Sequence, residues 1–312
     1  FNDNFYKNAL ILWISFGAPG LEPGLRNTLV IVSSGVFILP FFLFSATAGW
    51  LADSRAKDRV IRWTKLAEIL IMAAGAIAFL AGSIPALILV LFCMGAQSAW
   101  FGPAKYGVVP ELVPEENLLR ANGLVAMGTF VAILTGTLFG GLVGGLAEGR
   151  TLAACAIVLI AVFGWLVSLK IPRLEAKAPG TPRSGGWIRE TGHRLGEIRR
   201  ETRIFPLLVA ISWFWFHGAF ILQLLPIHFM QSTKSPLLPS TLDWMHAGAG
   251  MAGSLVTLSL LLFSGGIGIG SMIPGIQKTR HIETASSVWA LGLLSLTAIL
   301  VPLVESLLPL LL

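Results

Sequence analysis

Charged and amide side chains occur within very apolar segments of this chain, at spacings that suit a polar binding site. The first such segment carries Asp3, Asn4, Lys7 and Asn8. At 100° per helical residue these positions lie on one face about 140° wide, and Asp3 and Lys7, four residues apart, can pair. An ionisable side chain inside an apolar helix usually faces a cavity or a partner. We interpret this face as the lining of a polar cavity, and snorkelling at a helix end is the alternative.

A second polar face is expected in the segment 86–108. Gln97, Phe101 and Lys105 recur every four residues and share one side of a helix. Pro103 beside Gly102 predicts a bend that frees backbone carbonyls. Lys105 can bind a phosphate as a point charge, or it can snorkel to the membrane surface.

Glu68 is an isolated carboxylate in the segment 60–81. It could be the partner of Lys105 or Lys7 across the cavity. The plainer alternative is an ion pair near the water with Lys65, three residues earlier.

The sharpest local pattern is the loop Gly49-Trp-Leu-Ala-Asp53-Ser-Arg55-Ala-Lys57-Asp-Arg59. It resembles the loop motif of the major facilitator superfamily. The resemblance implies a conformational latch, in which Asp53 and the basic residues hold two halves of a helical bundle together in the outward-facing state. A generic basic loop is the alternative, but it does not explain Gly49 and Asp53 at this spacing.

The elements that position these residues are membrane-spanning helices. Apolar residues make up 55% of the chain and charged residues only 12%, with a mean hydropathy of +0.79, whereas a soluble domain is about a quarter charged. A bilayer needs about 20 helical residues per span. Nine such stretches are expected, and a tenth would begin near Leu307: 3–18, 28–51, 60–81, 86–108, 121–147, 151–170, 204–229, 247–273 and 285–304.

The basic residues predict the orientation of these spans. Eighteen of the 22 lysines and arginines lie in four alternate loops, and only Arg26, Arg150 and Lys234 lie in the opposite loops. The positive-inside rule therefore places the N-terminus and the long central loop in the cytoplasm. The basic charge is a topology signal and not a nucleic-acid footprint.

The long polar segment 171–203 divides the chain into an N-terminal six-helix half, 1–170, a cytoplasmic linker, 171–203, and an incomplete C-terminal half, 204–312. Within the linker, Ile188, Leu195 and Ile198 recur at helical spacing among arginines. This pattern predicts an amphipathic helix lying along anionic headgroups. A plain solvated linker is the alternative.

Other features have simpler interpretations. Gly136, Gly140 and Gly144, four residues apart, predict a close approach of two helices. The aromatic run 213–216 is interpreted as lipid-facing or packing residues, and His217 as a packing residue rather than a proton relay. Gly248, Gly250 and Gly253 imitate a dinucleotide fingerprint, but no strand precedes them. Cys93 and Cys155 lie in apolar runs and imply no disulfide framework.

Longer motifs narrow the resemblance. They are Asn2-Asp3-Asn4-Phe5 with Lys7-Asn8-Ala9-Leu10, Trp63 to Ile69, Phe101-Gly102-Pro103-Ala-Lys105-Tyr106-Gly107, and Asn122-Gly123-Leu124 before Gly128-Thr129. They are similar to the bacterial lysophospholipid transporters over most of residues 1–290. The resemblance implies inward movement of lysophosphatidylethanolamine-like lipids for reacylation. It also implies that Asp3, Asn4 and Lys105 help bind the headgroup, with a less defined role for Glu68.

The expected protein is thus an all-α membrane protein, a major-facilitator helical bundle with nine to ten of twelve spans, cut at both ends. The expected function is a lysophospholipid flippase of the bacterial inner membrane, working by alternating access. It is no enzyme and needs no cofactor or metal. Its partners are the lysophospholipid, membrane lipids and a fused or separate acyltransferase. The alternatives are a proton-coupled exporter of a small solute, which would depend on His217 or Glu68, and a membrane platform for a fused acyltransferase.

Overall fold

The computed structural model describes residues 1–14, 18, 20–144, 146, 148–180, 187–200 and 205–214, and the regular structure in these residues is helical. Five of the helices are long and apolar enough to cross a bilayer. In chain order the elements are α1 (Asn2–Leu12), α2 (Pro23–Ser54), α3 (Lys57–Ala81), α4 (Ile84–Gly107), α5 (Val109–Leu112), the 3₁₀ turn η2 (Glu115–Asn117), α6 (Leu118–Gly144), α7 (Gly149–Ser168) and α8 (Trp187–Arg200). A short apolar helix, Phe205–Phe214, follows.

Local sequence explains where these helices begin and end. Prolines occupy the first turns of α2, α4 and α5, where the missing N–H is not needed and the fixed φ suits a helix. Gly82 ends α3 with a φ of 65°, a left-handed conformation that glycine adopts without a steric penalty. The turn into α4 therefore needs only Gly82 and Ser83.

Five of the six spans expected before the central linker are confirmed, with boundaries shifted by a few residues. Of the expected span 3–18, the α-helical part ends at Leu12 and a π turn follows at Trp13 and Ile14, while residues 15–17 lie outside the described residues. Ala18 N–H donates to the carbonyl of Trp13, five residues earlier.

The spans expected at 247–273 and 285–304, and most of the span at 204–229, lie outside the described residues. Phe205–Phe214, the described part of the latter, is helical as expected. The glycines of the dinucleotide-like pattern and His217 also lie outside them.

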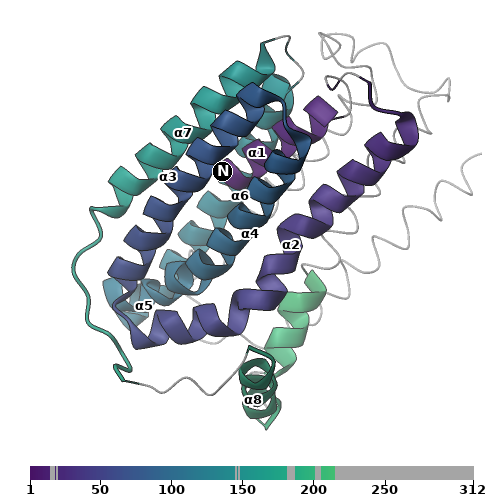
Figure 1. Ribbon diagram of the computed structural model, residues 1–312. Coiled ribbons are helices and arrows are strands. Elements are labelled where there is room, and N and C mark those ends of the chain that lie inside the picture. The colour runs from purple at the N-terminus through teal and green to yellow at the C-terminus, as the bar shows by residue number, and fades with distance from the viewer. Residues whose placement is uncertain are drawn as a thin grey trace, which may run out of the picture. The chain divides into compact units, whose positions relative to one another are not determined.

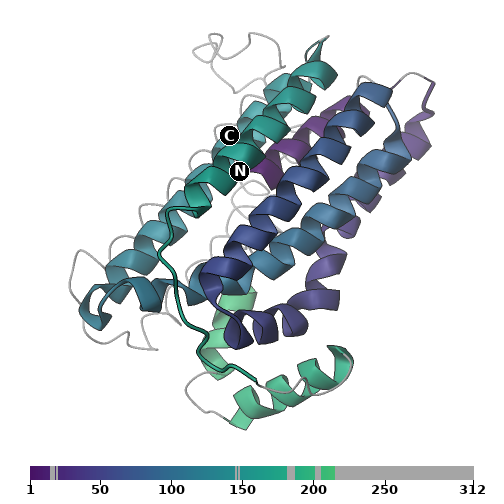
Figure 2. The ribbon, with the colours of Figure 1, turned by 60° about the vertical axis from the view of Figure 1, so that its left-hand side comes forward.

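Helices α1 to α7 belong to one compact unit. Within it α3 lies between α4 and α7, α2 packs along α4, and α6 packs along α1 (Figures 1 and 2). The largest buried cluster is built mainly from α1, α3, α4 and α7. At its centre the Tyr6 hydroxyl donates to the carbonyl of Leu87 over 2.9 Å, and the Tyr6 ring meets Phe79 edge-on. The short α1 is therefore a core element, and the side chains on its inner face are buried.

The expected glycine contact is confirmed between α6 and α1. A Cβ atom at Gly136 would lie 2.4 Å from the carbonyl oxygen of Phe1, and one at Gly140 would lie 2.3 Å from that of Phe5. At Gly144 it would lie 2.9 Å from the Cα of Ala9. The glycines therefore let the backbone of α1 rest directly on α6.

Candidate functional site

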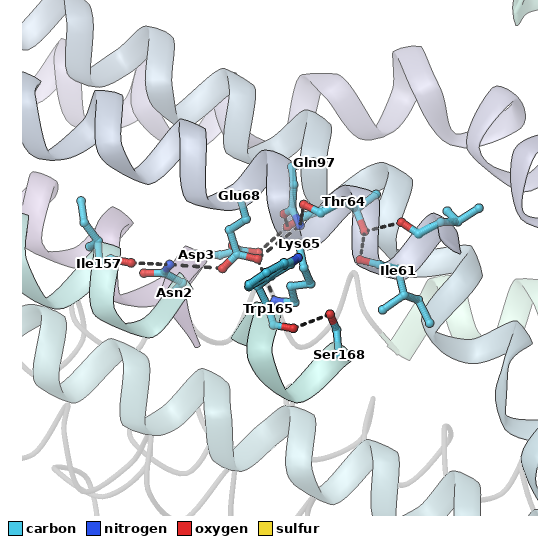
Figure 3. Close-up of polar contacts among 12 residues, drawn as sticks. Asn2, Asp3, Ile61, Thr64, Lys65, Glu68, Gln97, Ile157, Trp165 and Ser168 are labelled. Carbon is cyan, nitrogen blue, oxygen red and sulfur yellow. Dashed lines mark hydrogen bonds and ion pairs between the residues drawn. The ribbon is translucent and has the colours of Figure 1, made fainter. Parts of the chain in front are cut away.

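The centre of the bundle holds a buried polar network around Glu68, only 5% exposed (Figure 3). Its Oε1 atom accepts a hydrogen bond from Asn2 Nδ2 at 3.2 Å, and its Oε2 atom receives Lys65 Nζ at 2.7 Å and Gln97 Nε2 at 3.3 Å. Asn2 Nδ2 also donates to the carbonyl of Ile157 in α7. One carboxylate of α3 thus ties together α1, α4 and, through Asn2, α7.

Asp3 is joined to this network through Ser98. The Ser98 hydroxyl lies 2.5 Å from Asp3 Oδ2 and 3.4 Å from Gln97 Oε1. Gln97 in turn donates to the carbonyl of Thr64 at 3.2 Å and to Glu68. A continuous chain of contacts therefore runs from the Lys65–Glu68 ion pair to Asp3, and it holds the Asp3 carboxylate against α4.

Lys105 lies about two turns along α4 from Ser98. Its Nζ atom donates to Thr129 Oγ1 of α6 at 2.6 Å and sits 4.9 Å from the centre of the Tyr106 ring. Asp3 is held against the same helix by Ser98, seven residues before Lys105. Among the described residues no ion pair within 4.0 Å neutralises the Lys105 charge. This cation, half-buried and paired with a neutral hydroxyl, is suited to receive an anion.

The remaining residues of the α1 face divide between two neighbours. Lys7 Nζ lies 5.7 Å from the Phe37 ring centre of α2, a cation–π contact. Asn4 lies beside Gly136 of α6, and Asn8 donates from its amide to the carbonyl of Asn4 at 2.7 Å. No ion pair forms between Asp3 and Lys7 within the described part of the chain. The expected i, i+4 pair is thus absent, because Asp3 turns to Ser98 and Lys7 to Phe37.

Two expectations about partners need correction. Glu68 pairs with Lys65, the plainer alternative, and not with Lys105 or Lys7; Glu68 is buried and Lys65 is half-buried. Gln97 is 7% exposed and bonds to α3, so it supports the network instead of lining an open face. The physical reason is that α3 covers this side of α4, so that Gln97 finds its partners there.

The Gly49–Arg59 loop has a partner inside the same bundle. Lys57, only 3% exposed, forms an ion pair of 2.7 Å with Glu111 of α5. Gly107 makes room for it, since a Cβ there would lie 2.8 Å from Lys57 Cε. Lys177, beyond the end of α7, also approaches Glu111, at 3.6 Å. Lys57 is therefore already neutralised within the first half of the expected protein.

The segment that follows α7 is fastened to the same end of the bundle. Buried Asp58 accepts from the backbone N–H of Leu174, and Arg62 donates to the carbonyl of Ile171 at 2.6 Å. The N–H of Ala178 donates to the carbonyl of Asp53. The basic ends of α2, α3, α4 and α7 thus meet at one end, as the alternation of basic loops predicts.

Gly49, Asp53, Arg55 and Arg59 remain available for a latch. The Asp53, Arg55 and Arg59 side chains are exposed, and no atom would contact a Cβ at Gly49. A latch between two halves stays a prediction, because nearly all of the expected second half lies outside the described residues. Of the aromatic run, Trp213 is 46% exposed, in keeping with a lipid-facing residue.

Several members of these sites were missed by sequence reasoning. Asn2 and Ser98 adjoin predicted residues but carry no spacing signal of their own. Thr129 belongs to the quoted Gly128-Thr129 motif, yet nothing in the sequence links it to Lys105. Asp58 stands between Lys57 and Arg59, and an acid within a basic run is the signal that could have identified it; Glu111 carries no such signal.

The sequence of this chain is similar to those of known proteins. The family described as Major Facilitator Superfamily matches residues 8–308. A lysophospholipid transporter of Cronobacter sakazakii is 33% identical over 72% of this chain and 56% of its own length. One of Klebsiella pneumoniae is 33% identical over 85% of this chain and 66% of its own length. One of Escherichia coli is 34% identical over 72% of this chain and 56% of its own length. The chain spans a little over half to two thirds of the length of these relatives.

Proposed function

This chain belongs to the Major Facilitator Superfamily, and from that premise we propose that it is the membrane body of a lysophospholipid transporter. The similarity to relatives that bear this name supports the substrate class. The observation that carries the proposal is the placement of Lys105, a half-buried cation that donates to the neutral Thr129 and lies on the same helix that holds Asp3 through Ser98.

A zwitterionic headgroup needs one cation and one anion a few ångströms apart. In the proposed site Lys105 binds the phosphate of the lipid, and Asp3 binds the amine, with Asn4 beside them as a hydrogen-bonding group. The contact between Lys105 and Thr129 is a resting state from which the ammonium turns to the phosphate. Lys7 and Asn8 complete the polar face of α1.

In this proposal the buried network holds the Asp3 side chain of the site in one orientation. A carboxylate on a short helix would otherwise change rotamer freely, whereas Ser98 holds Asp3 and is itself held by Gln97. Glu68 and Lys65 orient Gln97. In this proposal Glu68 and Gln97 are positioning residues, and Asp3 and Lys105 contact the lipid.

The proposal extends to topology and partners. The protein lies in the bacterial inner membrane with its basic end in the cytoplasm, and residues 1–170 and 204–312 belong to two halves that rock around the site. Lysophosphatidylethanolamine-like lipids move inward and are reacylated by a fused or separate acyltransferase. Exposed Asp53, Arg55 and Arg59 are the part of the latch that reaches the second half.

The test is uptake of radiolabelled lysophosphatidylethanolamine by cells that express the full-length gene and lack other uptake of this lipid. We expect Asp3→Ala and Lys105→Ala to reduce uptake at least tenfold, because a charge-assisted hydrogen bond contributes about 1.5–3 kcal/mol. Arg120→Gln, at an exposed position outside the proposed site and outside the latch, is the matched control for the loss of one charge.

Membrane insertion is measured in parallel by the amount of protein in isolated membranes. Uptake by the unmodified protein no greater than that of cells with an empty vector would end the lipid assignment. Normal uptake by Lys105→Ala would leave the lipid assignment standing but remove Lys105 from the site.

A further inference from the structure

Helix α8 (Trp187–Arg200) has an apolar face to which the proposed function assigns no role. Ile188 is 68% exposed and Leu195 is 50% exposed, while Ile198 is half-buried. At 100° per residue these three positions lie within an arc of about 80°. Large apolar side chains gathered on one face of a solvent-exposed helix usually mark an interaction surface.

Charges are distributed around this face in a definite order. Arg199 lies about 20° beyond Ile188, at the border of the apolar arc, and Arg189 and Arg200 follow on the same side. The carboxylate of Glu197 is on the opposite side, 3.5 Å from His193. Arg199 therefore borders the apolar arc, and Arg189, Arg200 and Glu197 lie on the polar side of α8.

This order distinguishes between possible occupants. A surface that packs on protein has no need for an excess of arginines, whereas a bilayer interface offers acyl chains to an apolar face and phosphates to the cations beside it. Four arginines against two glutamates give the helix an excess of positive charge. That charge complements the anionic lipids of a cytoplasmic leaflet.

The chain also delivers this helix to a membrane surface. The spanning helix α7 ends at Ser168, and only four residues separate Arg200 from the apolar helix Phe205–Phe214. A segment tethered at both ends to membrane helices has a high effective concentration near the headgroups. A weak affinity for lipid is therefore sufficient to hold it there.

We infer that α8 lies in the interface of an anionic bilayer leaflet, with Ile188, Leu195 and Ile198 toward the acyl chains and its arginines at the phosphates. The inference is independent of the cargo and of the site near Asp3. Each arginine near an anionic surface changes the partition of such a helix by about fivefold.

The experiment places a nitroxide spin label on the full-length protein in lipid nanodiscs. The native Cys93 and Cys155 are first replaced by alanine. The test variant is Leu195→Cys, on the apolar face, and the matched control is Glu197→Cys, two residues away on the polar face. Collision with oxygen reports the acyl region, and collision with a water-soluble nickel chelate reports the aqueous phase.

In discs that contain phosphatidylglycerol we expect the Leu195→Cys label to meet oxygen but not nickel, and the Glu197→Cys label to meet nickel. In discs of phosphatidylcholine alone, or after Arg189, Arg199 and Arg200 are all changed to glutamine, the Leu195→Cys label should become several-fold more accessible to nickel.

Three results would overturn the inference. Free access of nickel to both labels in anionic discs would make α8 a solvated linker. Shielding of the Leu195→Cys label from both reagents, in detergent as well as in discs, would mean that protein covers the face. Equal protection in the two kinds of disc would remove the role of anionic lipid.

Discussion

Buried polar side chains in this bundle are matched to partners on other helices. Glu68 receives three donors, from Asn2, Lys65 and Gln97. Such matching is needed because a buried charge without partners is strongly destabilising in an apolar interior. The same network ends at Asp3, so a stabilising feature of the core also orients a residue of the proposed site.

The first residue-scale prediction concerns Glu68→Gln. The amide has one acceptor atom where the carboxylate has two. The NH₂ group of the new glutamine would therefore face other donors, either Asn2 or the pair Lys65 and Gln97. We expect a loss of stability of about 1–3 kcal/mol, measured as a lower unfolding temperature of the purified protein in detergent.

The double variant Lys65→Gln with Glu68→Gln is the control, since it leaves no unpaired buried charge. It should recover part of the lost stability. Because Glu68 acts through Gln97 and Ser98, Glu68→Gln should also raise the KM for lysolipid more than it lowers the maximal rate. Unfolding and KM values equal to those of the unmodified protein would contradict the positioning role.

At the scale of elements, glycine and proline determine how closely helices approach and where they end. Gly136, Gly140 and Gly144 bring α6 onto the backbone of α1. Gly95 does the same for α4 and α2, since a Cβ there would lie 2.3 Å from the carbonyl oxygen of Phe37. These contacts hold the polar face of α1 between α2 and α6, where Lys7 and Asn4 have their neighbours.

The element-scale prediction compares two adjacent glycines of α6. Gly140→Ala should destabilise the protein by about 1–3 kcal/mol, because the new Cβ would overlap the Phe5 carbonyl and force α1 outward. Gly141→Ala should be neutral or stabilising by up to about 1 kcal/mol, since nothing lies within 4 Å and alanine favours the helix.

Thermal unfolding of both variants in detergent measures this difference. The pair controls for helix propensity, because both changes are the same substitution in the same helix. Similar unfolding temperatures for the two variants would mean that α1 and α6 do not approach as closely as the structure has them.

At the scale of the whole molecule, one end of the bundle is basic and internally fastened. The Lys57–Glu111 ion pair and the bonds of Asp58 and Arg62 join the α2–α3 loop, α5 and the segment after α7. Breaking one partner of a buried pair costs about 3–5 kcal/mol. This end is therefore a rigid base from which exposed Asp53, Arg55 and Arg59 extend.

The whole-molecule prediction concerns orientation in the membrane. In a variant with Cys93 and Cys155 replaced by alanine, single cysteines are introduced as Glu22→Cys and Arg59→Cys, at exposed positions on opposite ends of α2 and its loop. A membrane-impermeant maleimide added to intact spheroplasts should label only Glu22→Cys, because the positive-inside rule puts the basic end in the cytoplasm.

Lysed spheroplasts serve as the control, and both variants should be labelled in them. Labelling of Arg59→Cys and not of Glu22→Cys in intact spheroplasts would reverse the proposed topology.

The sequence by itself determined the membrane class, five of the spans, the alternation of basic loops and the glycine contact of α6. These features follow from quantities that are local in the chain: a bilayer requires about 20 apolar residues per helix, and small residues four apart lie on one face. The family likewise followed from motifs that are short and contiguous, such as the loop from Gly49 to Arg59.

Only the tertiary structure decided which partner each polar residue takes. A helical spacing places Glu68 on a face, but whether Lys7, Lys65 or Lys105 neutralises it depends on which helix covers that face. The same holds for Gln97, which α3 covers, and for Lys57, which α5 neutralises. The cost of an unpaired buried charge selects the pairing, and that cost is fixed only when the helices are packed together.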